Sequence, residues 1–135
     1  MLRSLLVPAL LGLMALPALA SEVYVVVDIS DQVMNVRMDG EVVHSFPVST
    51  GRKGYSTPAG AYGVERMHKK YFSRKYDNAP MPYSIFFHGG YAIHGTTDIK
   101  RLGQIASHGC VRLYDEHVRE LYQLVRLGTP VTVLP

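Results

Sequence analysis

The chain is organised around two stretches, Ile93-His94-Gly95-Thr96-Thr97 and Ala106-Ser107-His108-Gly109-Cys110-Val111-Arg112-Leu113. The second stretch contains the only cysteine of the protein, with one histidine two residues before it and another sixteen residues before it. Glycines adjoin His94 and Cys110 and permit tight turns there. A thiol with imidazoles nearby is the combination used by a cysteine nucleophile and its base. The rest of the chain is expected to form a small β-rich scaffold that holds these groups.

Length and charge limit the class of protein. A chain of 135 residues is at most one ordinary domain. It carries 14 Lys and Arg against 11 Asp and Glu, a formal net charge of +3. This small excess suits an anionic polymer such as a cell wall, but it is too small for a nucleic-acid-binding surface. No nucleic-acid partner is therefore expected.

The N-terminus has the layout of a secretory signal peptide. Arg3 precedes an apolar run over residues 5–16, and Ala18-Leu19-Ala20 forms a small-x-small cleavage site. We therefore expect a signal peptide over residues 1–20 and a mature domain over residues 21–135. No other stretch is long and apolar enough to span a bilayer. The mature protein is expected in the periplasm or otherwise exported to the cell wall.

Export makes the lone cysteine informative. Cys110 has no partner in its own chain for a structural disulfide. A buried apolar cysteine is the alternative, but His108 and Gly109 directly before it are unusual neighbours for a core position. A chemical role for Cys110 is favoured.

Residue patterns predict a mainly β domain with little helix. Strands are expected over residues 22–29, 32–38, 41–49, 61–67, 83–87, 91–93 and 131–133. Asp39-Gly40 predicts a hairpin. A short helical turn is expected over residues 98–102, capped by Thr97 and ended by Gly103. One longer helix is predicted over residues 115–127, because its apolar residues recur on one face.

Two loops remain between these elements. Residues 50–60 form a glycine-rich loop, but no Lys-Ser pair follows at the spacing of a phosphate-binding loop and no helix pattern begins there, so they are interpreted as a shaped connection. Residues 68–76 mix basic and aromatic side chains. In an exported protein of low net charge, this mixture indicates a solvated loop or a flap over a substrate cleft.

The two stretches favour a cysteine nucleophile with a histidine base, and a metal site is the alternative. A neutral thiol needs a base or a positive neighbour to ionise near pH 7, and we expect a depressed pKa for Cys110. His94, arriving from another strand, is the preferred base, and His108 is expected to shape the site. Amides around Gly109 could bind a developing oxyanion. A metal site built from His94, His108 and Cys110 is disfavoured, because their spacing matches no zinc pattern.

The same residues resemble the L,D-transpeptidase catalytic domain of the YkuD type. The signature is Ile93-His94-Gly95-Thr96 followed by Ser107-His108-Gly109-Cys110-Val111-Arg112-Leu113. Supporting similarity is found in Ser49-Thr50-Gly51 leading to Thr57-Pro58-Ala59-Gly60, and in Met81-Pro82-Tyr83. The resemblance implies a mainly β sandwich or barrel with one helix near the C-terminus. It also implies an exported enzyme that cleaves the bond after the third residue of a peptidoglycan tetrapeptide stem, forming a cysteine thioester.

The resemblance also implies residue roles. Cys110 would be the nucleophile and His94 the general acid and base, oriented by the Gly95 carbonyl. Amides of His108, Gly109 and Cys110 would form the oxyanion hole. Cleft positions would be Ser107, Tyr83 and Arg112, with Arg112 alternatively bracing the loop. No cofactor or metal is implied.

Three classes of function remain open. The first is a transpeptidase that makes wall crosslinks or attaches a wall protein to stem peptides. The second is a hydrolase using the same thioester, either an L,D-carboxypeptidase or an enzyme that cleaves a wall-peptide link. The third is a non-catalytic wall-binding domain, which the presence of both Cys110 and His94 disfavours.

Overall fold

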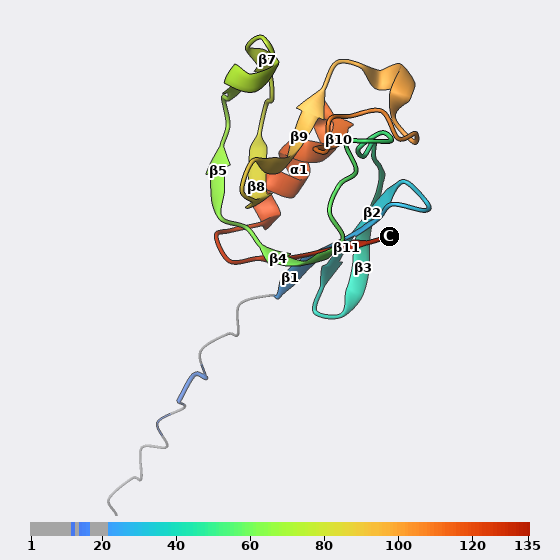
Figure 1. Ribbon diagram of the computed structural model, residues 1–135. Coiled ribbons are helices and arrows are strands. Elements are labelled where there is room, and N and C mark those ends of the chain that lie inside the picture. The colour runs from blue at the N-terminus through green and yellow to red at the C-terminus, as the bar shows by residue number, and fades with distance from the viewer. Residues whose placement is uncertain (1–11, 13, 17–21) are drawn as a thin grey trace, which may run out of the picture.

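The computed structural model describes residues 12, 14–16 and 22–135. Most of the predicted signal peptide, with its cleavage site, lies outside the described residues. Two main sheets form the domain, one five-stranded and one four-stranded (Figure 1). The mainly β architecture predicted from the sequence is confirmed. Within the described ranges, no helix is long and apolar enough to cross a membrane.

The five-stranded sheet has the order β3-β2-β1-β11-β4. Its strands are β1 (Val23–Asp28), β2 (Val33–Met38), β3 (Glu41–Pro47), β4 (Gly60–Gly63) and β11 (Pro130–Leu134). The predicted Asp39-Gly40 hairpin joins β2 to β3, and both residues have positive φ angles of 51° and 84°. The C-terminal strand β11 is inserted parallel to β1, so the end of the chain completes the sheet.

The four-stranded sheet has the order β10-β9-β8-β5 and carries the first stretch with part of the second. Its strands are β5 (Arg66–His68), β8 (Ser84–His88), β9 (Tyr91–Thr96) and β10 (Val111–Tyr114). Strands β9 and β10 are parallel and place Ile93 beside Val111 and His94 beside Arg112. Because side chains alternate across a strand, Ile93 and Val111 enter the core while His94 and Arg112 face the opposite side.

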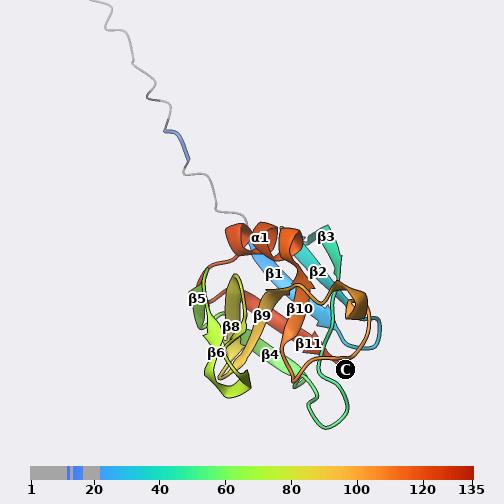
Figure 2. The ribbon, with the colours of Figure 1, turned by 90° about the horizontal axis from the view of Figure 1, so that it is seen from above.

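The core lies between the two sheets and is closed by helix α1 (Asp115–Leu124). In Figure 2 the helix runs along one margin of the domain, beyond the ends of β9 and β10. Val118 and Leu121 on one helix face are fully buried. Full burial of such a side chain contributes roughly 1.5–3 kcal/mol. The helix follows β10 directly, so its packing fixes the strand that begins just after the cysteine.

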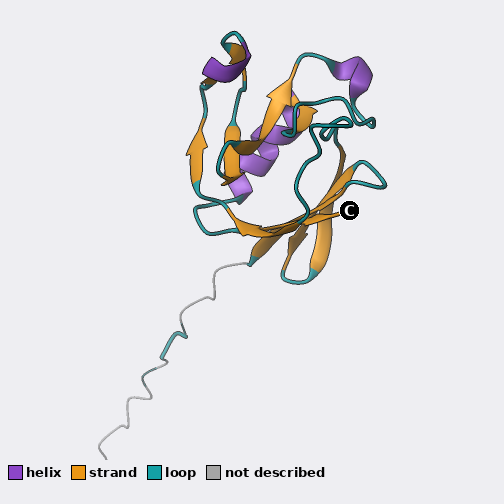
Figure 3. Ribbon diagram, in the orientation of Figure 1, coloured by secondary structure: helices purple, strands orange, loops and turns teal. Residues whose placement is uncertain are grey.

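The remaining elements are short and lie in loops (Figure 3). They are the two-stranded pair β6 (Phe72–Ser73) and β7 (Ala79–Pro80), and the 3-10 turns η1 (Arg74–Tyr76) and η2 (Ile99–Arg101). Residues 69–83, here called the flap, contain β6, η1 and β7. Backbone hydrogen bonds from Met81 to Tyr71 and from Tyr83 to Lys69 close its base, each 2.9 Å long.

Three sequence predictions were wrong in detail. The strand predicted over residues 61–67 is two strands in different sheets, because Val64 bonds to Thr129 and Glu65 bonds to Phe86 across the gap. The predicted helix ends at Leu124 instead of residue 127, because Val125 is extended and the chain turns towards β11. Asp98, not Thr97, precedes η2, and its N–H donates to the Thr96 hydroxyl.

Candidate active site

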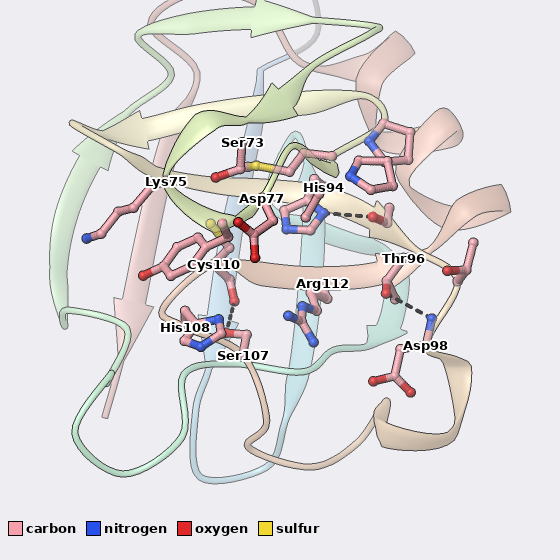
Figure 4. Close-up of a pocket in the computed structure, with 17 residues that line it drawn as sticks. Ser73, Lys75, Asp77, His94, Thr96, Asp98, Ser107, His108, Cys110 and Arg112 are labelled. Carbon is pink, nitrogen blue, oxygen red and sulfur yellow. Dashed lines mark hydrogen bonds between the residues drawn. The ribbon is translucent and has the colours of Figure 1, made fainter.

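A cavity of about 580 Å³ opens beside the ends of β9 and β10 (Figure 4). Its walls come from three segments that are far apart in the sequence: the flap, the end of β9 with the residues after it, and the turn before β10. The lining residues are Ser73, Lys75, Tyr76, Asp77, Ala79, Pro80, Met81, Pro82, His94, Gly95, Thr96, Thr97, Asp98, Ser107, His108, Cys110 and Arg112. The fold therefore brings the two stretches of the sequence signature into one site.

His94 is held rigidly in this wall. Its side chain is only 7% exposed, and Nδ1 lies 2.7 Å from the Gly95 carbonyl oxygen. A carbonyl oxygen can only accept, so the proton is assigned to Nδ1 and the neutral ring keeps a free lone pair on Nε2. The pKa of His94 is lowered to about 4, mainly by burial and to a smaller degree by the Arg112 charge, while the Gly95 hydrogen bond acts in the opposite direction. The ring is thus neutral near pH 7.

Gly95 is required for close packing as well as for its carbonyl. A Cβ at this position would lie 3.1 Å from Val118 and 3.2 Å from Pro82. The Gly95 N–H donates to the Pro82 carbonyl at 2.9 Å. Helix α1 and the base of the flap therefore both press on the residue whose carbonyl binds His94.

Cys110 directly precedes β10 and is half-buried, with a free thiol. Its Sγ donates a long, weak hydrogen bond to the Gly90 carbonyl oxygen at 4.0 Å. Figure 4 shows the sulfur on the side of Cys110 away from the His94 ring. Burial raises the pKa of the Cys110 thiol, against smaller lowering effects of the Ala92 N–H and Arg112. The depressed thiol pKa expected from the sequence is therefore wrong for the resting protein, because burial outweighs the groups that favour the thiolate.

The turn from Ser107 to Cys110 is fixed by its own hydrogen bonds. The Ser107 hydroxyl donates to the Cys110 carbonyl at 2.6 Å and accepts from the Gly109 N–H at 3.0 Å. Ser107 lines the cavity but is fully buried, and its hydroxyl is engaged in the turn, so its substrate contact stays a prediction. The Gly109 amide is likewise occupied. Among the described residues, the His108 and Cys110 amides have no hydrogen-bond partner, which leaves them as candidate oxyanion donors.

Gly109 has a φ of +118°, which disfavours any side chain. A Cβ there would approach the Tyr91 ring to 2.6 Å. Glycine is therefore needed both for the sharp turn into Cys110 and for the contact of that turn with β9.

His108 lies at the rim and joins two loops. Its ring stacks on Tyr76 of the flap, with centroids 4.3 Å apart and planes at 13°, and meets the edge of Tyr55 at 4.9 Å. Nε2 accepts from the Arg52 guanidinium at 3.1 Å. Partial burial lowers the pKa of His108, as do the nearby charges of Arg52, Arg112 and Lys75.

The two remaining predicted cleft residues have different positions. Arg112 lines the cavity beside His94, and within the described part of the chain its guanidinium makes no ion pair or side-chain hydrogen bond. Tyr83 does not line the cavity. Its ring packs edge-on against Tyr122 of α1, and the Arg119 guanidinium lies over it. Tyr83 has a left-handed backbone (φ 55°) and its ring faces the helix, so its substrate contact stays a prediction that this position does not favour.

Sequence reasoning missed parts of the site. The flap was predicted as one of two readings, but its individual residues Lys75, Tyr76 and Asp77 in the cavity wall were not identified. Thr57 was also missed, although its buried hydroxyl donates to the Gly109 carbonyl at 2.8 Å. These contacts join residues more than 30 positions apart, so no local pattern indicates them. Among the described residues, no group of three or more His, Cys, Asp or Glu side chains could hold a metal ion.

Comparison with known proteins agrees with this geometry. The family model of the YkuD L,D-transpeptidase catalytic domain matches residues 22–133. A putative L,D-transpeptidase YkuD of Bacillus subtilis is 25% identical over 82% of this chain, which spans 65% of that protein.

Solved structures show the same relationship. An L,D-transpeptidase from Mycobacterium smegmatis superimposes with a TM-score of 0.79 at 25% identity, covering 85% of this chain and 59% of that one. One from Stackebrandtia nassauensis gives 0.78 at 32% identity, covering 84% and 56%. L,D-transpeptidase 3 of Mycobacterium tuberculosis, solved with a faropenem-derived adduct, gives 0.78 at 26% identity, covering 85% and 61%. The family match over most of the described domain and the shared fold lead to one conclusion: the chain belongs to the YkuD family of L,D-transpeptidase catalytic domains.

Proposed function

We propose that this protein is an exported cysteine L,D-transpeptidase that acts on peptidoglycan stem peptides. The observation that carries the proposal is the placement of Cys110 and His94 in the wall of one cavity, with His94 Nδ1 bound to Gly95 and Nε2 free to accept a proton. Family membership supports the class of reaction. The roles of individual residues follow from the geometry.

The resting pair is a neutral thiol and a neutral imidazole. A pKa of about 4 makes His94 a weak base on its own, and the raised pKa of Cys110 makes the thiol a weak acid. Proton transfer must therefore accompany attack on the substrate carbonyl instead of preceding it. Because the thiol hydrogen-bonds to Gly90 at rest, rotation of the Cys110 side chain is the first motion. Catalytic hydrogen bonds are often long in free enzymes and shorten when substrate binds.

Acylation of Cys110 is the first half of the reaction. Cys110 gives its proton to His94 Nε2 while the sulfur bonds to the carbonyl carbon of the third stem residue. The carbonyl oxygen becomes an oxyanion, which the free amides of His108 and Cys110 stabilise. The C–N bond breaks, the leaving D-amino acid takes the proton from His94, and a thioester remains on Cys110.

Deacylation reverses these roles. An amine of another stem peptide, or of a wall-attached protein, bonds to the thioester carbonyl and gives a proton to His94. The sulfur leaves and recovers that proton, which regenerates the thiol. With water in place of the amine, the same steps give a carboxypeptidase or a link-cleaving hydrolase.

The cavity also fits an anionic peptide. Arg112 is unpaired within the described residues and Lys75 lies across the cavity on the flap. Both can meet carboxylates of a stem peptide, and Arg112 is near enough to lower the pKa of both His94 and Cys110. We assign Arg112 to substrate binding on this basis.

Product analysis tests the proposal. The purified protein is incubated with tetrapeptide muropeptides, and the products are identified by mass spectrometry. A crosslinked dimer with release of D-alanine is expected. Tripeptide without dimer would make the enzyme a hydrolase of the same family, and unchanged substrate with a reduced thiol would reject catalysis.

Covalent labelling tests the nucleophile separately. A relative carries a faropenem-derived adduct, and a strained β-lactam carbonyl is the same kind of electrophile as the stem amide. We expect faropenem or a carbapenem to add one drug-derived mass, mapped to the peptide containing Cys110. An adduct elsewhere, or none, would contradict the assignment.

Export is the other part of the proposal. Signal peptidase should cleave after Ala20, so that protein recovered from the periplasm or cell wall begins at Ser21. Sequencing of that N-terminus checks the site. Protein that keeps residues 1–20 in the cytoplasm would contradict export.

A further inference from the structure

The turn that carries Cys110 is held from behind by a second loop, residues 50–57. The Arg52 N–H donates to the Ser107 carbonyl at 3.0 Å. The Thr57 hydroxyl donates to the Gly109 carbonyl at 2.8 Å and accepts from the Gly51 N–H at 3.0 Å. Thr57 is only 3% exposed, so these two bonds are shielded from water. Both hydrogen-bonding directions of its hydroxyl are used within the protein.

The bond to Gly109 fixes more than one carbonyl. A peptide unit is planar and trans, so its C=O and N–H point in opposite directions. The Gly109 carbonyl and the Cys110 N–H belong to the same unit. With the carbonyl turned inward to Thr57, the Cys110 N–H faces the opposite way, and within the described residues it has no protein partner. Cys110 lines the cavity, whereas Thr57 lies outside it.

This peptide needs an external restraint. Gly109 has a φ of +118° and no side chain, so its backbone has more freedom than that of any other residue type. If the Gly109–Cys110 peptide rotated, its carbonyl oxygen could replace the N–H at the cavity. An oxyanion would then meet a partial negative charge instead of a donor. Ser107 holds the neighbouring Gly109 N–H and Cys110 carbonyl, but not the Gly109 carbonyl.

We propose that Thr57 is a positioning residue for acyl transfer, whose hydroxyl holds the Gly109–Cys110 peptide so that the Cys110 amide faces the developing oxyanion. Thr57 touches neither the reacting atoms nor the cavity. The inference rests on the proposed function, because it concerns the tetrahedral step at Cys110. Removing an oxyanion donor itself costs about 10²–10³-fold in rate. Loss of the residue that orients the donor should cost roughly 10- to 100-fold.

Thr57→Val tests the proposal. Valine keeps the shape of threonine and removes the hydroxyl, whereas Thr57→Ser keeps the hydroxyl. Thr129→Val is the matched control, because Thr129 is also buried (5% exposed) and its hydroxyl accepts from the Arg126 N–H at 2.9 Å, in the connection to β11. Thr57→Ala replaces Thr57→Val if the valine variant does not fold.

Two rates are measured on each purified variant. The first is acylation by faropenem, followed by intact mass, which passes through a tetrahedral oxyanion. The second is alkylation by iodoacetamide, in which the sulfur displaces iodide and no oxyanion forms. A change in thiol exposure or pKa alters both rates, whereas a misplaced oxyanion donor alters only the first.

Thr57→Val is expected to slow acylation roughly 10- to 100-fold and to leave alkylation unchanged. Thr57→Ser and Thr129→Val should acylate at close to the wild-type rate. Acylation of Thr57→Val at the wild-type rate, or an equal fall in both of its rates, would overturn the inference while wild-type acylation still upholds the proposed function. If the wild-type protein is alkylated but not acylated, the proposed function itself fails.

Discussion

The two histidines of the signature, His94 and His108, are the same residue type in opposite settings. His94 lies within strand β9, is 7% exposed and binds one fixed backbone carbonyl, Gly95, through Nδ1. His108 lies in a turn, and its ring is held by Arg52 and by stacking on Tyr76 of the flap. One histidine is fixed by the sheet and the other by two loops.

This difference decides what each ring can do. The contact that fixes His94 occupies Nδ1, so Nε2 remains available inside the cavity. The contact that fixes His108 occupies the lone pair of Nε2, because the Arg52 guanidinium can only donate. Arg52 therefore makes His108 a poor proton acceptor at that nitrogen. A histidine beside the nucleophile in sequence is thus less suited to serve as the base than one that arrives from another strand.

Removing the group that both histidines flank should have the largest effect. Cys110→Ala is expected to abolish turnover on muropeptides, because no other thiol exists to form the acyl-enzyme. The fold should persist, since the side chain is half-buried and makes one long hydrogen bond. Turnover and the thermal midpoint are measured together. Wild-type turnover by the folded variant would show that Cys110 is not the nucleophile.

His94→Ala should have the next largest effect. Positioned proton transfer typically contributes about 10²–10⁴-fold to rate, and we expect a loss of that order in kcat/KM. His117→Ala is the control, because His117 stacks on Phe46 in the contact between α1 and β3, outside the cavity lining. Equal losses in these two variants, or a larger loss in His108→Ala, would reassign the base.

The two histidines should also differ in how they make the free energy of unfolding depend on pH, an effect smaller than those on turnover. The pKa of His94 is about 4 in the folded state, against an ordinary histidine pKa of 6.5 in the unfolded chain. The unfolded chain therefore binds the proton first, and stability is complete above about pH 6.5 and is lost as pH falls through about 4. The loss is of the order of 3 kcal/mol.

His94→Gln is the variant that isolates this effect. Its free energy of unfolding, measured by denaturant titration between pH 4 and 7, should fall less steeply with acid than that of the wild-type protein. His108→Gln should keep most of the wild-type slope, because His108 is partly open to solvent. Parallel curves for His94→Gln and the wild-type protein would contradict the burial argument.

Local patterns predicted most of the elements but not all of their edges, and strands β6, β7 and β10 were missed. The Asp39-Gly40 hairpin, the strands that flank it and the C-terminal strand were predicted because each has a short-range signal in the sequence. The single segment predicted over residues 61–67 was wrong because Val64 and Glu65 bond to different partners, β11 and β8, which no local pattern encodes. For the same reason the helix was predicted to end at residue 127, whereas it ends at Leu124.

The sequence predicted the site residues that belong to the signature, but it did not indicate the residues that support them, such as Thr57. Cys110, His94 and the Gly95 carbonyl do lie at one cavity. Ser107 and Tyr83 were expected in substrate contact, but one is occupied by the turn and the other faces α1. Proton equilibria were also missed, because the raised pKa of Cys110 depends on burial that only the assembled fold creates.

The smallest predicted effect concerns the ring of His108, and it tests what that ring does. His108→Phe keeps an aromatic face for stacking on Tyr76 but cannot accept from Arg52. His108→Ala loses both contacts. If the ring serves to hold the flap to the turn, His108→Phe should stay within about 10-fold of wild-type kcat/KM, since one hydrogen bond contributes about 0.5–1.5 kcal/mol. His108→Ala should raise KM more than it lowers kcat, because Tyr76 and Lys75 would lose their anchor at the cavity wall.

A second observable separates this holding role from proton transfer. Limited proteolysis of the flap should accelerate in His108→Ala and remain at the wild-type rate in His108→Phe, because stacking on Tyr76 needs a ring and not a nitrogen. Proton transfer would need the nitrogen, and phenylalanine would then be as damaging as alanine. Equal loss of kcat in both variants, with no change in proteolysis, would therefore place His108 in the chemistry and end the division of roles between the two histidines.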